Sequence, residues 1–124
     1  HLPVYFLSLP GMGKMAAVSG EVTSSELKEI KYLGVEAIEA SIIPRKDYRK
    51  PLTARDLLHY RFIVDQTELP VLVSTQKKIR PEEVRILKHI GVSGIVIGAV
   101  VTGNELENFG KVVREFRKAI DDLV

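Results

Sequence analysis

The two halves of the chain repeat one pattern of residues. An apolar run opens at Leu2-Pro3-Val4 and again at Leu69-Pro70-Val71, and the segment Lys31–Ile38 (KYLGVEAI) aligns with Lys88–Ile95 (KHIGVSGI). Each half reads as strand, helix, Gly-Val step, strand and helix. Short buried strands that alternate with helices favour a parallel sheet, because each helix returns the chain to the end where the next strand begins. We therefore predict an α/β fold.

The expected elements follow each other without a linker or a low-complexity tract. Strands are predicted at 4–9, 35–43, 70–75 and 92–98, and helices at about 23–33, 53–66, 81–91 and 104–123. Thr23 and Thr53 stand where helix N-caps are expected, and Pro81 stands at a helix N1 position. The sequence predicts a single domain over 1–124 that consists of two repeats, at about 2–66 and 69–124.

Four strand-helix units are too few to close a (β/α)8 barrel, which needs eight strands. If all helices lie on one side of the sheet, the chain forms a TIM-like half-barrel. If two crossovers pass to the other side, it forms an open doubly wound, flavodoxin-like sheet. The repetition favours the half-barrel. Its uncovered apolar face then predicts a homo-oligomer or a complementary half-barrel as partner.

Composition narrows the classes of function. The absence of cysteine excludes disulfides, thiolate metal sites and a cysteine nucleophile, and no apolar run is long enough for a membrane span. His59 and His89 fall in predicted helices, away from the strand-to-helix loops, so we predict no metal site. The net charge of +2 makes nucleic acid an unlikely partner. We expect a cytoplasmic protein, and its few Asn and Gln residues fit a thermophile.

The loops that leave the strands are basic. In a parallel sheet they all lie at one end, so their charges act on one surface. Asp47 is the only acidic residue of these loops outside the starts of the flanking helices. Cations that converge beside helix N-termini favour a phosphate or carboxylate ligand, although solvated surface lysines would leave the same pattern. The cations are Lys14, Arg45, Lys46, Arg49, Lys50, Lys77, Lys78 and Arg80.

The last predicted strand ends in the small residues Gly98-Ala99-Val100-Val101-Thr102, followed by Gly103. Residues 69–124 resemble the C-terminal quarter of phosphate-binding (β/α)8 barrels of the ribulose-phosphate-binding type. The resemblance implies that the N–H groups of this turn bind a phosphate. The preceding strand departs from that family, because it ends in Ser74-Thr75-Gln76-Lys77-Lys78 and lacks a glycine-rich turn. The Asp-x-Lys-x-x-Asp array of the family's decarboxylases and synthases is also absent, so neither activity carries over.

Two residues are candidates for acid/base chemistry. Glu36 and Glu39 interrupt the second apolar strand on opposite faces, and Glu39 lies nearer its carboxyl end, beside the expected site. An edge strand would expose both glutamates to solvent without any catalytic role. Lys14 lies in a glycine-containing loop, Leu9–Met15, which would act as a lid over a ligand.

These observations predict a site for a small phosphorylated metabolite or flavin mononucleotide (FMN) at the carboxyl ends of the strands. Glu39 and Lys14 are the predicted catalytic residues, in a possible lyase, isomerase or synthase. The predicted phosphate ligands are Ser74, Thr75, Lys77, Arg45, Gly98, Ala99, Thr102 and Gly103.

A second function remains open from the sequence. The run Arg45-Lys-Asp-Tyr-Arg-Lys50 places cations around one aromatic ring, a pattern that contacts phosphates of a polyanion or an acidic protein surface. The chain would then be a non-catalytic binding or assembly module.

Overall fold

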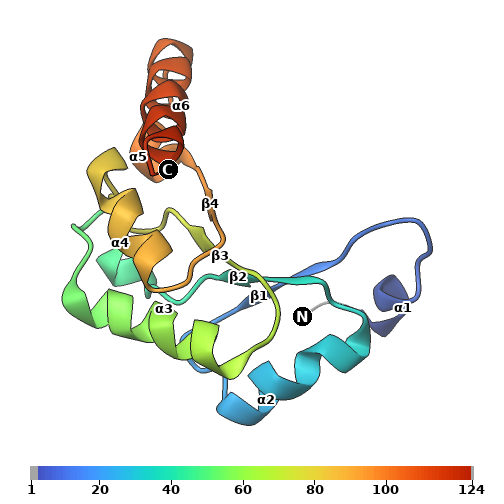
Figure 1. Cartoon of the computed structure of the whole chain (residues 1–124). Helices are drawn as coiled ribbons and strands as arrows, with labels where there is room; N and C mark the ends of the chain where they lie inside the picture. Colours follow the sequence, from blue (N-terminus) through green and yellow to red (C-terminus); the bar gives the residue numbers. More distant parts are fainter. Residues whose placement is uncertain (1–2, 124) are drawn as a thin grey trace.

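The structure, a computed structural model, describes residues 3–123 and contains one four-stranded parallel sheet (Figure 1). Its strands lie in sequence order, β1-β2-β3-β4. This order excludes the doubly wound alternative, in which the strand order reverses part-way across the sheet. The fold is the predicted half-barrel arrangement. The strands are β1 (Met15–Val18), β2 (Ala37–Ala40), β3 (Val71–Ser74) and β4 (Gly94–Val96).

The helices alternate with the strands. Capping boxes start α2 at Thr23 and Glu26 and α3 at Thr53 and Asp56, which confirms the two N-caps expected from the sequence. No helix within residues 3–123 is long and apolar enough to cross a lipid bilayer. The helices are α1 (Val4–Leu7), α2 (Ser24–Glu29), α3 (Ala54–Gln66), α4 (Val84–His89), α5 (Ala99–Thr102) and α6 (Leu106–Asp121), with 3-10 turns η1 (Ile30–Leu33), η2 (Arg45–Asp47) and η3 (Pro81–Glu83).

The first predicted strand is wrong. Val4–Leu7 form the short helix α1, and β1 lies between the predicted strand 4–9 and the predicted helix 23–33, where no strand is expected. Lys14 therefore precedes a strand and does not follow one, and its carbonyl accepts a hydrogen bond from Glu36 N (2.8 Å) at the amino end of the sheet. Tertiary pairing with β2 decides which segment becomes the edge strand, and it overrides the β-rich composition of the segment before it. The proposed alignment of the segments that open at Leu2 and Leu69 is therefore wrong for the described residues, because Val4 lies in a helix and Val71 lies in a strand.

The aligned segments Lys31–Ile38 and Lys88–Ile95 each lead into a strand, and these two strands pair in the same way with the strand before them. Ala16 pairs with Ile38 between β1 and β2, and Val73 pairs with Ile95 between β3 and β4. Both residues of the second pair follow those of the first by 57 positions (73 − 16 and 95 − 38), the spacing that separates Lys31 from Lys88. The glycines of the two Gly-Val steps, Gly34 (φ 78°) and Gly91 (φ 99°), also share the left-handed conformation. β3 and β4 thus pair with each other in the same register as β1 and β2.

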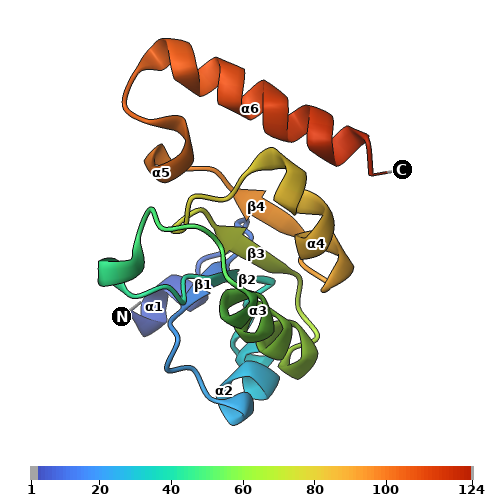
Figure 2. The ribbon, with the colours of Figure 1, turned by 90° about the vertical axis from the view of Figure 1, so that its left-hand side faces the viewer.

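The two faces of the sheet differ. Helices α2, α3 and α4 lie on one face (Figure 2), where the strands bury the apolar side chains of Val18, Ile38, Ala40, Val71 and Val73 in the core. Alternate residues point to the other face, which we call the open face. In a complete barrel this face would line the interior. The open face carries Met15, Ala17, Ala37, Glu39, Leu72, Ser74, Gly94 and Val96.

Candidate functional site

Figure 2 looks onto the carboxyl ends of the four strands, where the strand-to-helix loops gather. Glu39 reaches this end on the open face and accepts a hydrogen bond from Ser74 Oγ on the neighbouring strand. Ser41 Oγ lies 3.3 Å from Ser74 Oγ. Since Ser74 gives its only hydroxyl proton to Glu39, Ser41 is the donor of the second bond. The three side chains form a chain of hydrogen bonds that ends on a carboxylate.

The turn from β4 into α5 is fixed by Thr75. The Thr75 hydroxyl donates to the Val96 carbonyl (3.1 Å) and accepts from Gly98 N (2.8 Å). The predicted phosphate ligand Thr75 is thus buried and bonded to backbone groups of the neighbouring strand end. Gly98 likewise gives its N–H to Thr75, although its backbone is exposed.

The amide of Ala99 remains accessible at this turn. The N–H groups of Val101, Thr102 and Gly103 bond back to Gly98 and Ala99 carbonyls. The first N–H groups of a helix have no partner within it, and within residues 3–123 Ala99 N has no acceptor. The Thr102 hydroxyl is buried and donates to backbone carbonyls of the same turn, while Gly103 (φ 70°) ends it. Ala99 is therefore the predicted residue of this turn that offers a free donor.

Lys77 is held away from the loop surface. Its Nζ lies 3.2 Å from Asp56 Oδ2, and the two side chains are only 6% and 14% exposed. The same Asp56 accepts from Thr53 N in the capping box of α3. The ammonium therefore joins the β3 loop to the start of α3. Burial raises the pKa of the nearby Tyr60 hydroxyl well above its ordinary value, with a smaller effect from the Asp56 charge.

The basic loop 44–51 packs on the loop that follows β3. Gln76 Oε1 accepts from Ile43 N (3.2 Å), and Gln76 Nε2 donates to Tyr48 Oη (3.0 Å). Arg49 has the left-handed φ of 68°, and its N–H bonds to the Gln76 carbonyl. The hydrogen bond from Lys50 lowers the pKa of Asp47, and nearby lysines add to the effect. Arg45, a predicted phosphate ligand, is exposed on this loop.

A groove of about 810 Å³ lies between the carboxyl ends of β1 and β2 and the first turns of α3. Lys46, Arg55 and His59 line it together with Ser41, and the carboxylates of Glu21, Asp47 and Asp56 lie beside them. The expectation that His59 lies away from the loops is wrong. A helix that follows a strand begins at the carboxyl end of the sheet, so its first two turns belong to that surface. This rule would have identified Arg55 and His59 from their distance to Thr53.

The predicted site residues are therefore only partly brought together. Glu39 and Ser74 are in contact, and the Ala99 turn lies beyond the next strand. Lys14 is at the opposite end of the sheet, where its Nζ donates to the Leu9 carbonyl (2.7 Å). Among the described residues, no three His, Asp or Glu side chains converge as metal ligands would.

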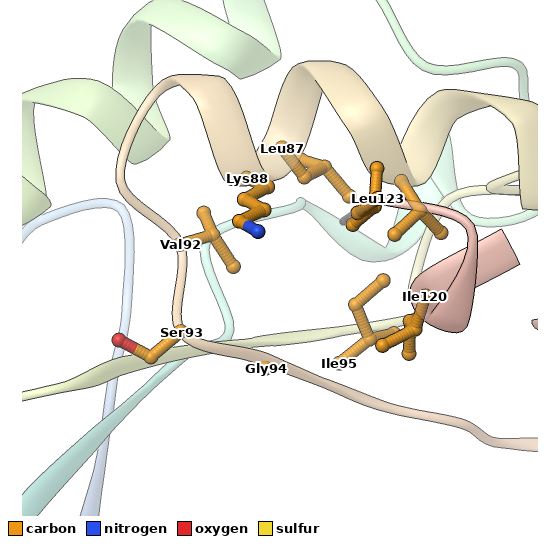
Figure 3. A pocket seen from close by; sticks show the side chains of 9 residues that line it. Leu87, Lys88, Val92, Ser93, Gly94, Ile95, Ile120 and Leu123 are labelled. Atoms are coloured by element: carbon orange, nitrogen blue, oxygen red, sulfur yellow. The ribbon is translucent and has the colours of Figure 1, made fainter. Parts of the chain in front are cut away.

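A second cavity, of about 390 Å³, has a mostly apolar lining (Figure 3). It opens between α4, the amino end of β4 and the last turn of α6. Leu87, Val92, Ile95, Ile120 and Leu123 line it. Lys88 and Ser93 add an amine and a hydroxyl to this lining, which is otherwise typical of incomplete packing between helices.

Comparison with solved structures shows which fold this is. The chain superposes on a thiamine phosphate pyrophosphorylase from Pyrococcus furiosus with a TM-score of 0.69 and 23% identity, covering 99% of this chain and 56% of that one. A structure described as native KDPGal gives a TM-score of 0.66 and 16% identity, covering 91% and 50% of the two chains. These are TIM-barrel-type folds. The chain adopts the same fold over about half of their length.

A further similar structure is a cube-shaped protein cage designed by fusing symmetric oligomeric domains. Its TM-score is 0.64 at 17% identity, and the match covers 91% of this chain and 38% of that chain. No family model and no curated protein matches the sequence. The likeness at these identities concerns the fold.

Proposed function

We propose that the carboxyl end of the sheet binds a small phosphorylated metabolite, and that Glu39 performs acid/base chemistry on it. The phosphate accepts hydrogen bonds from the amides that begin α5, chiefly Ala99 N. The rest of the ligand extends over the open face toward the Glu39 carboxylate. The observation that carries the proposal is the pairing of a short extra helix after β4 with a carboxylate on the open face two strands away.

The position of α5 supports the phosphate part. TIM barrels often bind phosphate at the N-terminus of a short extra helix that follows one of the last strands. α5 is such a helix, since it follows β4 and precedes the long helix α6. Of the three similar structures described above, one is named for a phosphate ester, thiamine phosphate. This name describes that protein, and it is consistent with a phosphate ester as the class of ligand that we propose here.

The hydrogen bonds of Glu39 support the acid/base part. Ser74 holds one carboxylate oxygen, and Ser41 lines the neighbouring groove and bonds to Ser74. Glu39 can therefore exchange a proton with a ligand while the two hydroxyls keep its orientation. In this proposal Ser41 and Ser74 are positioning residues. Lys14 takes no part, because it lies at the amino end of the sheet.

The test removes one N–H and keeps the helix. Ala99 occupies the N1 position of α5, where proline is tolerated, and Gly98 before it is extended (ψ −177°), as a residue before proline must be. We expect Ala99→Pro to weaken binding of ribose 5-phosphate or FMN at least tenfold in a calorimetric titration. Ala54→Pro makes the same change at N1 of α3 and should leave the affinity unchanged. Equal affinity for wild type and Ala99→Pro would refute the phosphate site.

The non-catalytic alternative rests on loop 44–51. Its cations Arg45, Lys46 and Arg49 are exposed, and Gln76 holds the loop against the β3 loop, so they form a fixed basic surface. A docking role predicts binding to heparin or RNA that ignores sequence and fades steeply with salt. Saturable binding of one phosphate ester that persists at 0.2 M salt, about a physiological level, would favour the first proposal.

A further inference from the structure

Helix α6 lacks part of the surface on which such a helix packs. It contacts α4, α5 and η3, and Figure 1 shows it standing away from the sheet, whereas α2 and α3 run alongside the strands. Its apolar stripe is accordingly only partly covered: Phe116 is buried, whereas Leu106 is 90%, Phe109 50% and Ile120 36% exposed. The apolar cavity of Figure 3 opens under its last turn.

The equivalent helix of the first repeat shows what is missing. α3 follows β2 and lies over the sheet where β2 pairs with β3, and its inward residues Tyr60 and Ile63 are 0% and 2% exposed. α6 follows β4, the equivalent of β2, but β4 has no further strand beside it within the described chain. A strand paired with the free edge of β4 would provide the missing part of the surface on which α6 packs, as β3 does for α3.

We propose that this edge receives β1 of a second copy of the chain, so that two copies close one eight-stranded barrel. The repeat defines the contact: β4 is equivalent to β2, and β1 is equivalent to β3, in each case displaced by 57 positions. The β2–β3 register pairs Ile38 with Val71 and Glu39 with Leu72. The same register between copies pairs Ile95 with Lys14, and Val96 with Met15.

Closure follows from the number of strands. When one edge of a sheet pairs with the other edge of a second copy, the copies form either a closed ring or an open filament, depending on the rotation between them. With four strands per copy, two copies give the eight strands of a barrel, and the two-fold axis runs along the barrel. Each copy then supplies half of a fold whose solved neighbours are about twice as long as this chain. The open faces become one interior, and each ligand site gains a covered wall. The inference concerns the same surface as the proposed function but needs no ligand.

The charge on the open face should affect the strength of dimer association. Glu39 is the only charged residue of the open face as defined above, so closure places two like charges in one interior. Removing the charge should strengthen association. We expect Glu39→Gln to lower the dimer dissociation constant severalfold in sedimentation velocity. Glu36→Gln makes the same charge change at an exposed residue beyond the open face and should leave the constant unchanged.

The direct test uses the absence of cysteine. In Met15→Cys/Val96→Cys the two new thiols lie on strands three spacings apart, about 14 Å, too far for a disulfide within one copy. Between copies they are direct cross-strand partners. We expect oxidation to give a covalent dimer with no free thiol and no larger species. The pair Ala17→Cys/Val96→Cys, shifted by two residues along β1, should cross-link at least severalfold less.

The outcomes are separable. A wild-type chain that stays monomeric at 100 μM, a ladder of larger cross-linked species, or equal cross-linking of the two pairs would each overturn the proposal. Binding of ribose 5-phosphate at the α5 turn is measured separately, so failure of the dimer and failure of the phosphate site can be distinguished.

Discussion

At the scale of single residues, the polar side chains of the β3 loop divide between the site and the interior. Ser74 points to the open face and bonds to Glu39, whereas Thr75 and Lys77 point inward, where Thr75 holds the β4 turn and Lys77 pairs with Asp56. The sequence shows which residues carry suitable groups but not which partner each one meets. Asp56 lies on a different element from Lys77, and no local pattern indicates their contact.

Lys77 is expected to contribute to stability. Lys77→Met leaves the mostly buried Asp56 carboxylate with the Thr53 N–H as its remaining partner, so we expect the free energy of unfolding to fall by up to about 3 kcal/mol, the low end of the cost of breaking a buried pair. Urea unfolding followed by circular dichroism measures this loss. The neighbouring Lys78 is exposed, and Lys78→Met should change the free energy by less than about 0.5 kcal/mol. A stable Lys77→Met variant with weakened phosphate binding would return Lys77 to the ligand site.

At the scale of elements, the helices were more predictable than the strands. Thr23, Thr53 and the glycines Gly34 and Gly91 mark starts and stops through local hydrogen bonds and backbone conformation, so they are visible in the sequence. β1 has the composition Met-Ala-Ala-Val, with no strong β preference, and its pairing with β2 is tertiary. The 57-residue spacing of the repeat nevertheless locates β1. Subtracting 57 from the bounds of β3 gives residues 14–17, which differ from the bounds of β1 by one residue.

The two repeat glycines provide a matched pair of variants. Both have left-handed φ values, so Gly34→Ala and Gly91→Ala should each cost about 1–2 kcal/mol of unfolding free energy from backbone strain. A Cβ on Gly34 meets no atom within 4 Å, whereas one on Gly91 would lie 2.7 Å from Val64 Cγ1. We therefore expect Gly91→Ala to be the more destabilising in urea unfolding. Equal losses would contradict the tight contact between this turn and α3.

At the scale of the whole molecule, the parallel half-barrel followed from the alternation of strands and helices, which also places the strand-to-helix loops at one end of the sheet. The sequence also predicted Glu39 at that end. It did not predict the groove at Arg55 and His59, because both residues were assigned to a helix without asking which end of the sheet the helix starts from. In a parallel α/β sheet, the surface at the carboxyl ends of the strands includes the first turns of the helices as well as the loops.

The most direct test of the account locates a ligand on this surface. In a ¹H–¹⁵N NMR titration of the uniformly labelled chain with ribose 5-phosphate, we predict saturable shifts of the Ala99 and Val100 amides, followed by those of Ser74 and Glu39. Sodium chloride at matched ionic strength should leave these amides unchanged. Shifts confined to residues 45–50, or no saturable shift at Ala99, would contradict the phosphate site at the start of α5.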